Sequence, residues 1–330
     1  MNSPLRFVPF LRPMVWGGRR LAEVLGKSLP TADPYGESWE ISDHRLHHSL
    51  VANGPLKGRS LRDLMTNARA ALLGKHAPEH AVFPWLVKFL DASDWLSVQV
   101  HPDTEAVRRL WPGEGSKTEA WFVLAAEPKS RIYAGLLPGT DEAKLRAALE
   151  SGTVAECLHH FKPSPGDCIF LPAGTVHAVG GGVLMAEVQQ TSDATFRLFD
   201  WNRRDAQGNA RELHIEQSLA CIDWARGPVY PVQVHDFATS SAGMVSAAER
   251  IPLVKCPFFE LEYRWENEPF TCGGDDISQV MIVVRGGACL SGFGGEEELH
   301  VGQMWILPAA MSRSCCRPDP GVGILVCTLP

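Results

Sequence analysis

Two residues that can bind a metal ion stand two positions apart in the segment Trp95–Asp103. If this segment is a β-strand, alternation puts Gln99 and His101 on one side of it and the intervening apolar residues on the other. The two side chains are then about 7 Å apart along the chain, so they can share one ion when other ligands come from elsewhere. A polar strand face in contact with water has the same pattern, and this alternative stays open for these residues alone.

Two later segments supply further ligands. Lys117 and Glu119 stand two residues apart at the start of an apolar strand pattern, where a buried carboxylate needs a cation beside it. His177 follows a short apolar run and the tight turn Pro172–Gly174, which would present its imidazole at the mouth of a barrel.

The candidate ligands are one amide oxygen, two imidazole nitrogens and one carboxylate oxygen, from Gln99, His101, Glu119 and His177. This donor set suits one Zn²⁺ ion per chain and leaves coordination positions for water or substrate. Because a structural zinc site has no open position, the set predicts a catalytic one.

A carboxylate and a guanidinium are expected beside this site. Glu187 and Gln189 share one face of the predicted strand 183–189, and Arg197 lies on the strand that follows, 195–200. A metal ion with a carboxylate and a guanidinium is suited to moving a proton next to a carbonyl group. These residues therefore predict proton transfer on a small substrate.

The composition restricts the class of protein. The chain has 330 residues, 45% of them hydrophobic and 21% charged, which is typical of one large or two ordinary globular domains. The net charge of −7 and the lack of a Lys/Arg run argue against nucleic-acid binding but not against an anionic small substrate. The sequence predicts no signal peptide and no membrane span. Its nine scattered cysteines are typical of reduced thiols, so we expect a cytoplasmic protein.

Helical patterns are few and short. Ser60–Leu73 predicts a helix capped by Ser60, and Asp141–Glu150 predicts a helix capped by Thr140. Two shorter helical stretches are expected, at Thr104–Leu110 and Val154–His159.

Short strand patterns fill most of the remaining chain. Glu119–Ala125 predicts a buried strand with Arg131–Gly135 as its hairpin partner, and Trp85–Leu90 predicts a strand that leads into Trp95–Asp103. Further short strands are separated by Gly and Pro between Cys168 and Asp200, which indicates a sandwich or barrel.

A second set of short strands follows a predicted boundary in Ser240–Arg250. The segment Gly166–Ala173 is echoed by Gly302–Ala309, which predicts two related β-barrel units, over residues 1–240 and 241–330. The second unit lacks the metal-type residues, because Met311–Arg313 stands where the first unit continues to His177.

Four motifs resemble those of one enzyme family, at Val98–Asp103, Lys117–Trp121, Pro172–Ala178 and Gln190–Arg197. Three shorter stretches agree with them, at Trp16–Gly18, Gly36–Ser42 and Asp200–Arg203. In this order the motifs are similar to those of type I mannose-6-phosphate isomerases, in the short bacterial form that lacks a helical insert domain. The resemblance extends from about Phe10 to Arg203 and is weaker toward the C-terminus.

This resemblance implies a mainly β fold of two cupin-type β-barrels (jelly rolls) with a few short helices. The C-terminal barrel is the degenerate one. The family binds one zinc ion through residues that match Gln99, His101, Glu119 and His177. The implied enzyme is an aldose–ketose isomerase that interconverts D-mannose 6-phosphate and D-fructose 6-phosphate through a cis-enediol. Its partner is thus a sugar phosphate, and we expect a monomer or a weak homo-oligomer.

The family's pocket residues match Arg197, Lys88, Lys117 and Glu187. Because Arg197 keeps its proton, we assign it electrostatic stabilisation of the enediolate. Glu187 is the first candidate for the proton shuttle and a zinc-bound water the second, and Lys88 and Lys117 are the candidates for holding the phosphate or a sugar hydroxyl. Trp16 is a candidate platform for the sugar ring.

Each of these roles has a structural alternative. Glu187 could orient His177 as a hydrogen-bond partner, and Lys117 could only neutralise Glu119. Lys88 could be a surface lysine of an edge strand, and Trp16 and Trp39 could be core residues.

Two other classes of cupin have to be weighed against the isomerase. An iron-dependent dioxygenase usually presents two or three histidines with one carboxylate, and Gln99 in the first position argues against it. A non-enzymatic sugar-binding cupin would have lost the metal ligands or Arg197, and this chain retains them.

Overall fold

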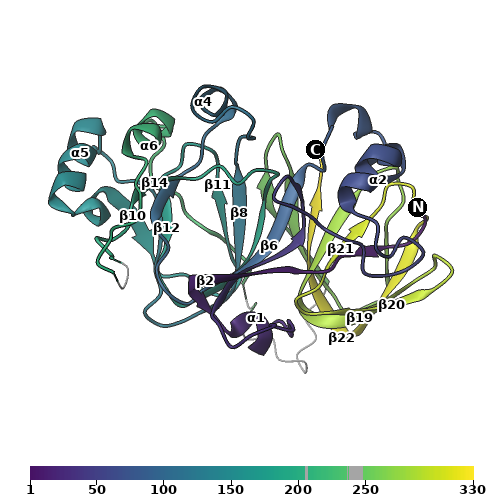
Figure 1. Ribbon diagram of the computed structural model, residues 1–330. Helices are drawn as coiled ribbons and strands as arrows, with labels where there is room; N and C mark the ends of the chain where they lie inside the picture. The colour runs from purple at the N-terminus through teal and green to yellow at the C-terminus, as the bar shows by residue number, and fades with distance from the viewer. Residues whose placement is uncertain (205–206, 236, 238–247) are drawn as a thin grey trace.

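The computed structural model describes residues 1–204, 207–235, 237 and 248–330. The chain is mainly β with a few short helices, as predicted. Most of its strands form three large sheets that pack face to face (Figure 1). The predicted boundary at Ser240–Arg250 falls largely outside the described residues. No helix of the described residues is long and apolar enough to cross a membrane.

The middle sheet has seven strands in the order β15-β11-β8-β13-β6-β3-β2. Their bounds are β2 Phe10–Gly18, β3 Tyr35–Ile41, β6 Trp85–Ala92, β8 Glu119–Ala126, β11 Asp167–Leu171, β13 Val183–Gln190 and β15 Val232–Gln233. A five-stranded sheet packs on one of its faces, in the order β10-β9-β12-β7-β14. Its strands are β7 Val98–Val100, β9 Ile132–Leu136, β10 Leu158–Phe161, β12 His177–Val179 and β14 Phe196–Phe199.

The eight-stranded third sheet covers the other face of the middle sheet (Figure 1). Its strands are β1 Leu5–Arg6, β16 Glu249–Lys255, β17 Glu260–Glu266, β18 Phe270–Cys272, β19 Gln279–Ser291, β20 Glu296–His300, β21 Met304–Leu307 and β22 Ser314–Thr328. A separate small hairpin joins β4 Asp43–His44 to β5 His47–His48. Since β1 pairs with β21, the start of the chain belongs to the C-terminal sheet, and the division at residue 240 stays a prediction.

Six α-helices and two 3₁₀-helices connect the strands in the described part of the chain. They are α1 Arg20–Glu23, α2 Leu61–Asn67, α3 Arg69–Leu73, α4 Thr104–Leu110, α5 Glu142–Ser151, α6 Ile215–Cys221, η1 Ala77–Glu79 and η2 Val154–Cys157. The helix predicted over 60–73 is capped by Ser60 as expected but is broken at Ala68 into α2 and α3.

Alternation along the middle strands explains their unbroken apolar character. In β8, Ala120 and Phe122 pack toward the third sheet, whereas Trp121 and Val123 pack toward the five-stranded sheet. A strand buried on both faces is apolar at nearly every position, because neither face meets water. Glu119 shares a face with Trp121, so this carboxylate points between the middle and five-stranded sheets.

Two sequence predictions about local structure are wrong. The strand β9 does not pair with β8; it crosses to the five-stranded sheet and pairs with β10 and β12, because both neighbours of β8 are already β11 and β13. The cap of α5 is Asp141, whose side chain accepts from the N–H of Lys144, and not Thr140. Asp and Thr are both common N-cap residues, so residue type alone did not decide between the two neighbours. The position at which the backbone becomes helical decided it.

The predicted internal repeat appears as two similar turns. Gly166 precedes β11 with φ 93° and Gly302 precedes β21 with φ 83°, a left-handed conformation that favours glycine. After β11 the chain continues to His177, whereas after β21 it reaches Met311, which is buried in the apolar core of the third sheet. The second unit therefore has a hydrophobic residue in the region where the first has a polar site.

Candidate functional site

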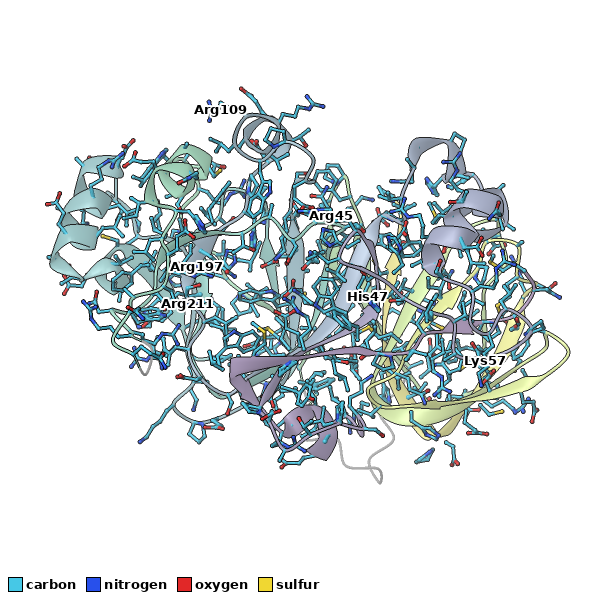
Figure 2. All side chains as sticks on the ribbon, in the orientation of Figure 1. Arg45, His47, Lys57, Arg109, Arg197 and Arg211 are labelled. Atoms are coloured by element: carbon cyan, nitrogen blue, oxygen red, sulfur yellow. The ribbon has the colours of Figure 1, made fainter. Side chains whose placement is uncertain are left out.

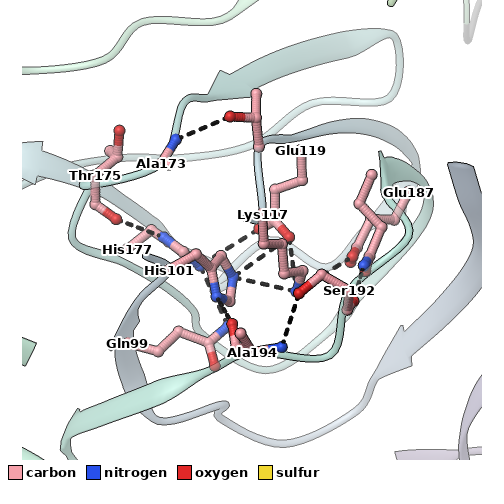
Figure 3. A network of polar contacts seen from close by, with 12 residues as sticks. Gln99, His101, Lys117, Glu119, Ala173, Thr175, His177, Glu187, Ser192 and Ala194 are labelled. Carbon is pink, nitrogen blue, oxygen red and sulfur yellow. Dashed lines mark hydrogen bonds and ion pairs between the residues drawn. The ribbon is translucent and has the colours of Figure 1, made fainter. Parts of the chain in front are cut away.

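The four predicted ligand residues come together between the two sheets of the first unit (Figure 3). Gln99 and His177 are paired across β7 and β12, His101 follows β7, and Glu119 begins β8 of the opposite sheet. The Nε2 atom of His101 lies 3.4 Å from Oε2 of Glu119, and that of His177 lies 3.4 Å from Oε1. Residues far apart in sequence thus meet because the loop ends of three strands converge.

Both imidazoles are held with Nε2 facing Glu119. Nδ1 of His101 lies 2.8 Å from the carbonyl oxygen of Ala194, and Nδ1 of His177 lies 2.8 Å from that of Thr175. A carbonyl only accepts, so each Nδ1 carries the proton and each Nε2 presents a lone pair that a metal ion or an N–H donor can use. Burial lowers the pKa of both rings, that of His101 to about 3, so they are neutral at pH 7.

Glu119 is buried among groups that favour its charged form. Neither of its carboxylate oxygens accepts a hydrogen bond from the described residues, and its exposed fraction is 1%. Burial by itself would raise its pKa, but the ammonium of Lys117, with Nζ 2.9 Å from Oε2, holds the pKa well below 4.5. A buried carboxylate with unused acceptor oxygens is suited to a cation.

These donors fit a single divalent metal ion. The candidate ligand atoms of His101, Glu119 and His177 all lie within 4.8 Å of one another. The amide of Gln99 is close by, with Nε2 3.2 Å from Nε2 of His177, and a half-turn of the amide plane would put its oxygen there instead. Two nitrogens and one or two oxygens form a set that zinc accepts.

A row of alternating charges crosses the inner face of the middle sheet toward Glu119. Arg12 Nη1 on β2 lies 2.8 Å from Glu37 Oε2 on β3, and Lys88 Nζ on β6 lies 3.2 Å from Glu187 Oε1 on β13. Lys117 Nζ completes the row, 3.8 Å from the same oxygen of Glu187. The strands that carry Arg12, Glu37, Lys88 and Glu187 are neighbours in the sheet, so each charge faces one of opposite sign.

The pKa values of Glu187 and Lys88 are both raised, but for different reasons. Burial raises the pKa of Glu187 to about 7, although the ammonium of Lys88 opposes the rise. Burial also disfavours charge on Lys88, but the carboxylates of Glu187 and Glu37 more than offset it and raise the pKa of Lys88 above 10.5. Glu187 is therefore a carboxylate that can gain and lose a proton near neutral pH.

The alternative role for Glu187 as a partner of His177 is wrong. Thr175 holds one ring nitrogen of His177, and the other faces Glu119. Glu187 contacts the two lysines instead.

Three predicted substrate contacts lie deeper than expected. Lys88 and Lys117 are only 5% and 4% exposed, and each is in an ion pair with a buried carboxylate. Trp16 is 6% exposed and lies in the apolar core between the two sheets, where its ring packs against Gly36. Substrate contact by these residues stays a prediction.

Arg197 lies on β14, directly beside Gln99 of β7. Its Nη1 donates a 2.8 Å hydrogen bond to the carbonyl oxygen of Glu212, and its Nε is buried with no hydrogen-bond partner among the described residues. No contact of Arg197 with Glu119 is found in the described part of the chain. Arg197 therefore lies at the side of the ligand cluster.

Sequence reasoning missed Glu37 and Arg12 as parts of the site. Glu37 accepts hydrogen bonds from Nη1 of Arg12 and from Nε1 of Trp39. The available signal was Glu37 two residues before Trp39 on one face of the strand, because a charge on an inward face requires a partner. The carbonyls of Thr175 and Ala194 had no signal at all, since any residue type supplies one.

Comparisons with known proteins identify the family to which this chain is similar. A family model described as phosphomannose isomerase type I, catalytic domain, matches residues 5–126. The chain is 37% identical to mannose-6-phosphate isomerase ManA of Bacillus subtilis over 79% of this chain and 78% of that protein. It is 38% identical to mannose-6-phosphate isomerase of Streptococcus mutans over 81% and 79% of the two chains.

The fold is similar to that of solved structures. A crystal structure of mannose 6-phosphate isomerase from Bacillus subtilis matches 99% of both chains, with a TM-score of 0.85 and 28% identity. A phosphomannose isomerase from Salmonella typhimurium, at 18% identity, matches 98% of this chain and 99% of that one with a TM-score of 0.73, which shows a shared fold.

Proposed function

Because the chain belongs to the type I mannose-6-phosphate isomerase family and is an isomerase, we propose that it interconverts D-mannose 6-phosphate and D-fructose 6-phosphate. The observation that carries the proposal is the placement of Glu119 between two imidazoles. Its oxygens lie 3.4 Å from each Nε2, and Lys117 is the one lysine or arginine of the described residues in an ion pair with them, which is an arrangement suited to a metal-dependent isomerase.

Zinc is the metal we propose, held by Gln99, His101, Glu119 and His177. The bound ion would supply Lewis-acid polarisation of the sugar oxygens. Gln99 adds an uncharged oxygen, so the set carries only one negative charge and leaves the ion electrophilic. A dioxygenase-type iron site with a further histidine does not match this set.

The proton transfer falls to Glu187 in this proposal. Isomerisation removes a proton from carbon 2 of the aldose and returns it to carbon 1 through a cis-enediol. A carboxylate with a pKa of about 7 can take up this proton and release it again without a large penalty in either direction. Lys88 and Lys117 both contact Oε1 of this carboxylate, at 3.2 Å and 3.8 Å, and so restrict its orientation.

Positive charge near the substrate completes the scheme. Arg197 is assigned to stabilise the negative charge that develops on the enediolate oxygens, because a guanidinium keeps its proton. Lys117 adjoins Glu119 and is the second candidate for holding a substrate oxygen. Trp16 would at most border the sugar from the core side.

A coupled assay with mannose 6-phosphate tests the proposal. Zinc-loaded protein should produce fructose 6-phosphate, dialysis against a chelator should abolish this activity, and added zinc should restore it. Metal analysis of the purified protein separates zinc from iron. A zinc-loaded, folded protein that turns over no mannose 6-phosphate would contradict the proposal. A cytoplasmic location and a monomeric or weakly oligomeric state remain predictions.

A further inference from the structure

Three arginines gather beside β14, the edge strand of the five-stranded sheet. Nη2 of Arg203 lies 2.6 Å from Oδ1 of Asp200, and Nη1 of Arg211 lies 3.5 Å from the same oxygen. Arg203 also donates to the carbonyl oxygen of Trp95, so its guanidinium is well occupied. Arg211 is farther than Arg203 from the Asp200 oxygen that both contact, and its side chain is 41% exposed.

Arg197 and Arg211 lie close together at the edge of the first unit (Figure 2). Burial and the neighbouring charge of Arg211 both lower the pKa of Arg197. Nε of Arg197 has no hydrogen-bond partner in the described part of the chain, although it is buried. An unused buried donor on one guanidinium, with the charge of a second guanidinium beside it, favours an anion with several acceptor oxygens between them.

Arg197 is on the strand face that is turned toward the candidate metal centre. Phe196 and Leu198 belong to the apolar core on the outer side of β14, so Arg197 between them points inward. Its neighbour across the strands is Gln99, whose amide lies 3.2 Å from His177. One strand spacing, about 4.8 Å, therefore separates Arg197 from a candidate ligand of the metal. A hexose 6-phosphate that binds the metal through its oxygens on carbons 1 and 2 has four more carbons. This length lets its phosphate extend from the metal toward the two arginines.

The lysines of the site are less suited to a phosphate dianion. Lys88 and Lys117 are buried and paired with Glu187 and Glu119, so binding a phosphate would require those pairs to break. We propose that Arg211, with Arg197 beside it, binds the phosphate group of the substrate, an inference that rests on the proposed function. Arg197 has five N–H donors, so one edge of its guanidinium can face the phosphate and the other the sugar oxygens.

Steady-state kinetics of Arg211→Ala test this inference. The loss of a charge-assisted bidentate contact should raise KM for mannose 6-phosphate about tenfold or more, with kcat within about twofold of wild type. The inhibition constant for inorganic phosphate should rise by a similar factor, and Arg211→Lys should fall between the two proteins because it keeps the charge without the fork. Arg204→Ala is the matched control: this exposed arginine of the same segment bonds to the Gly208 carbonyl and should leave KM unchanged.

A substrate without a phosphate separates binding from general damage. The kcat/KM for unphosphorylated mannose should be equal in wild type and Arg211→Ala. An unchanged KM for mannose 6-phosphate, or an equal loss for both substrates, would overturn the inference. If zinc-loaded wild type turns over no sugar phosphate, the proposed function fails. Calorimetry with inorganic phosphate then still tests the inference, which fails if wild type and variant bind phosphate equally or not at all.

Discussion

The ammonium of Lys117 lies 2.9 Å from Oε2 of Glu119, the carboxylate that both imidazoles of the candidate metal centre face. The same ammonium is 3.2 Å from Nε2 of His101. A metal ion bound by these ligands would therefore contact the same carboxylate as the Lys117 ammonium. Lys117 can neutralise Glu119 when no metal is bound, so this lysine links the stability of the protein to its metal content.

Lys117→Met should destabilise the zinc-free protein far more than the zinc-loaded one. Without a cation, buried Glu119 is left unpaired, which costs about 3–5 kcal/mol of the free energy of unfolding. Urea unfolding with a chelator and with excess zinc measures both values. Lys57→Met, at an exposed lysine, is the control and should change neither. An equal loss in both conditions would show that Lys117 does not act through Glu119.

His177→Ala should remove bound zinc. It deletes one of the two Nε2 lone pairs that face Glu119, so zinc affinity should fall by more than the roughly 100-fold that follows loss of an outer-shell partner. Gln99→Ala deletes a neutral ligand and should weaken zinc binding less. Metal analysis after dialysis, and competition with a chelator, measure both. His300→Ala, at an exposed histidine of β20, should retain one zinc per chain; retention of zinc by His177→Ala would exclude this ligand set.

Residue type and alternation were enough to single out the candidate ligands but not to place them in the fold. The pattern around Glu119 shows a carboxylate entering a strand that is apolar on both faces, and this signal needs no tertiary information. The sheet to which each strand belongs depends on long-range pairing. The strand after β8 therefore looked like its hairpin partner, although it crosses to the sheet that carries His177.

The charge row and the deep lysines mark the second limit of sequence reasoning. Lys88 stands in an apolar strand and could be interpreted as a surface or phosphate-binding residue. Only the neighbouring strands show that Glu37 and Glu187 flank it. Its charge therefore pairs with buried carboxylates. The more exposed Arg211 is part of no motif that would have identified it from the sequence.

The pH dependence of activity should report Glu187. A base with a pKa of about 7 must be deprotonated to act, so kcat/KM should fall about tenfold per pH unit below 7 and level off above it. Lys88→Met removes a charge that lowers this pKa, so the acid limb should move about one unit or more to higher pH. The phosphate of the substrate, with a pKa near 6, titrates equally in both assays, so the shift between the two proteins isolates Glu187. An unmoved limb would assign it to another group.

Glu37→Gln should change how stability responds to acid. Burial opposes the charge of Glu37, but Lys88 and Arg12 hold its pKa below the usual 4.5. An acid with a lowered folded-state pKa stabilises the fold above its unfolded pKa and loses this contribution as the pH falls through the folded value. The variant should thus lose about 1–3 kcal/mol at pH 7 but show a smaller further loss between pH 5 and pH 3. Urea unfolding at these pH values measures it, and parallel losses in both proteins would contradict the pairing.

Glu187→Gln should abolish the proton transfer while the site remains formed. The amide keeps the shape, and its remaining oxygen can accept from Lys88, whose Nζ lies 3.2 Å from Oε1 in the wild type, but it cannot take a proton from carbon 2. Turnover and exchange of the carbon-bound hydrogen with solvent deuterium should both fall by about 10²-fold or more, with zinc content unchanged. Glu114→Gln, at a buried acid bonded to His44 instead, is the matched control and should exchange normally. Exchange near the wild-type rate in Glu187→Gln would show that another group, such as a zinc-bound water, carries the proton.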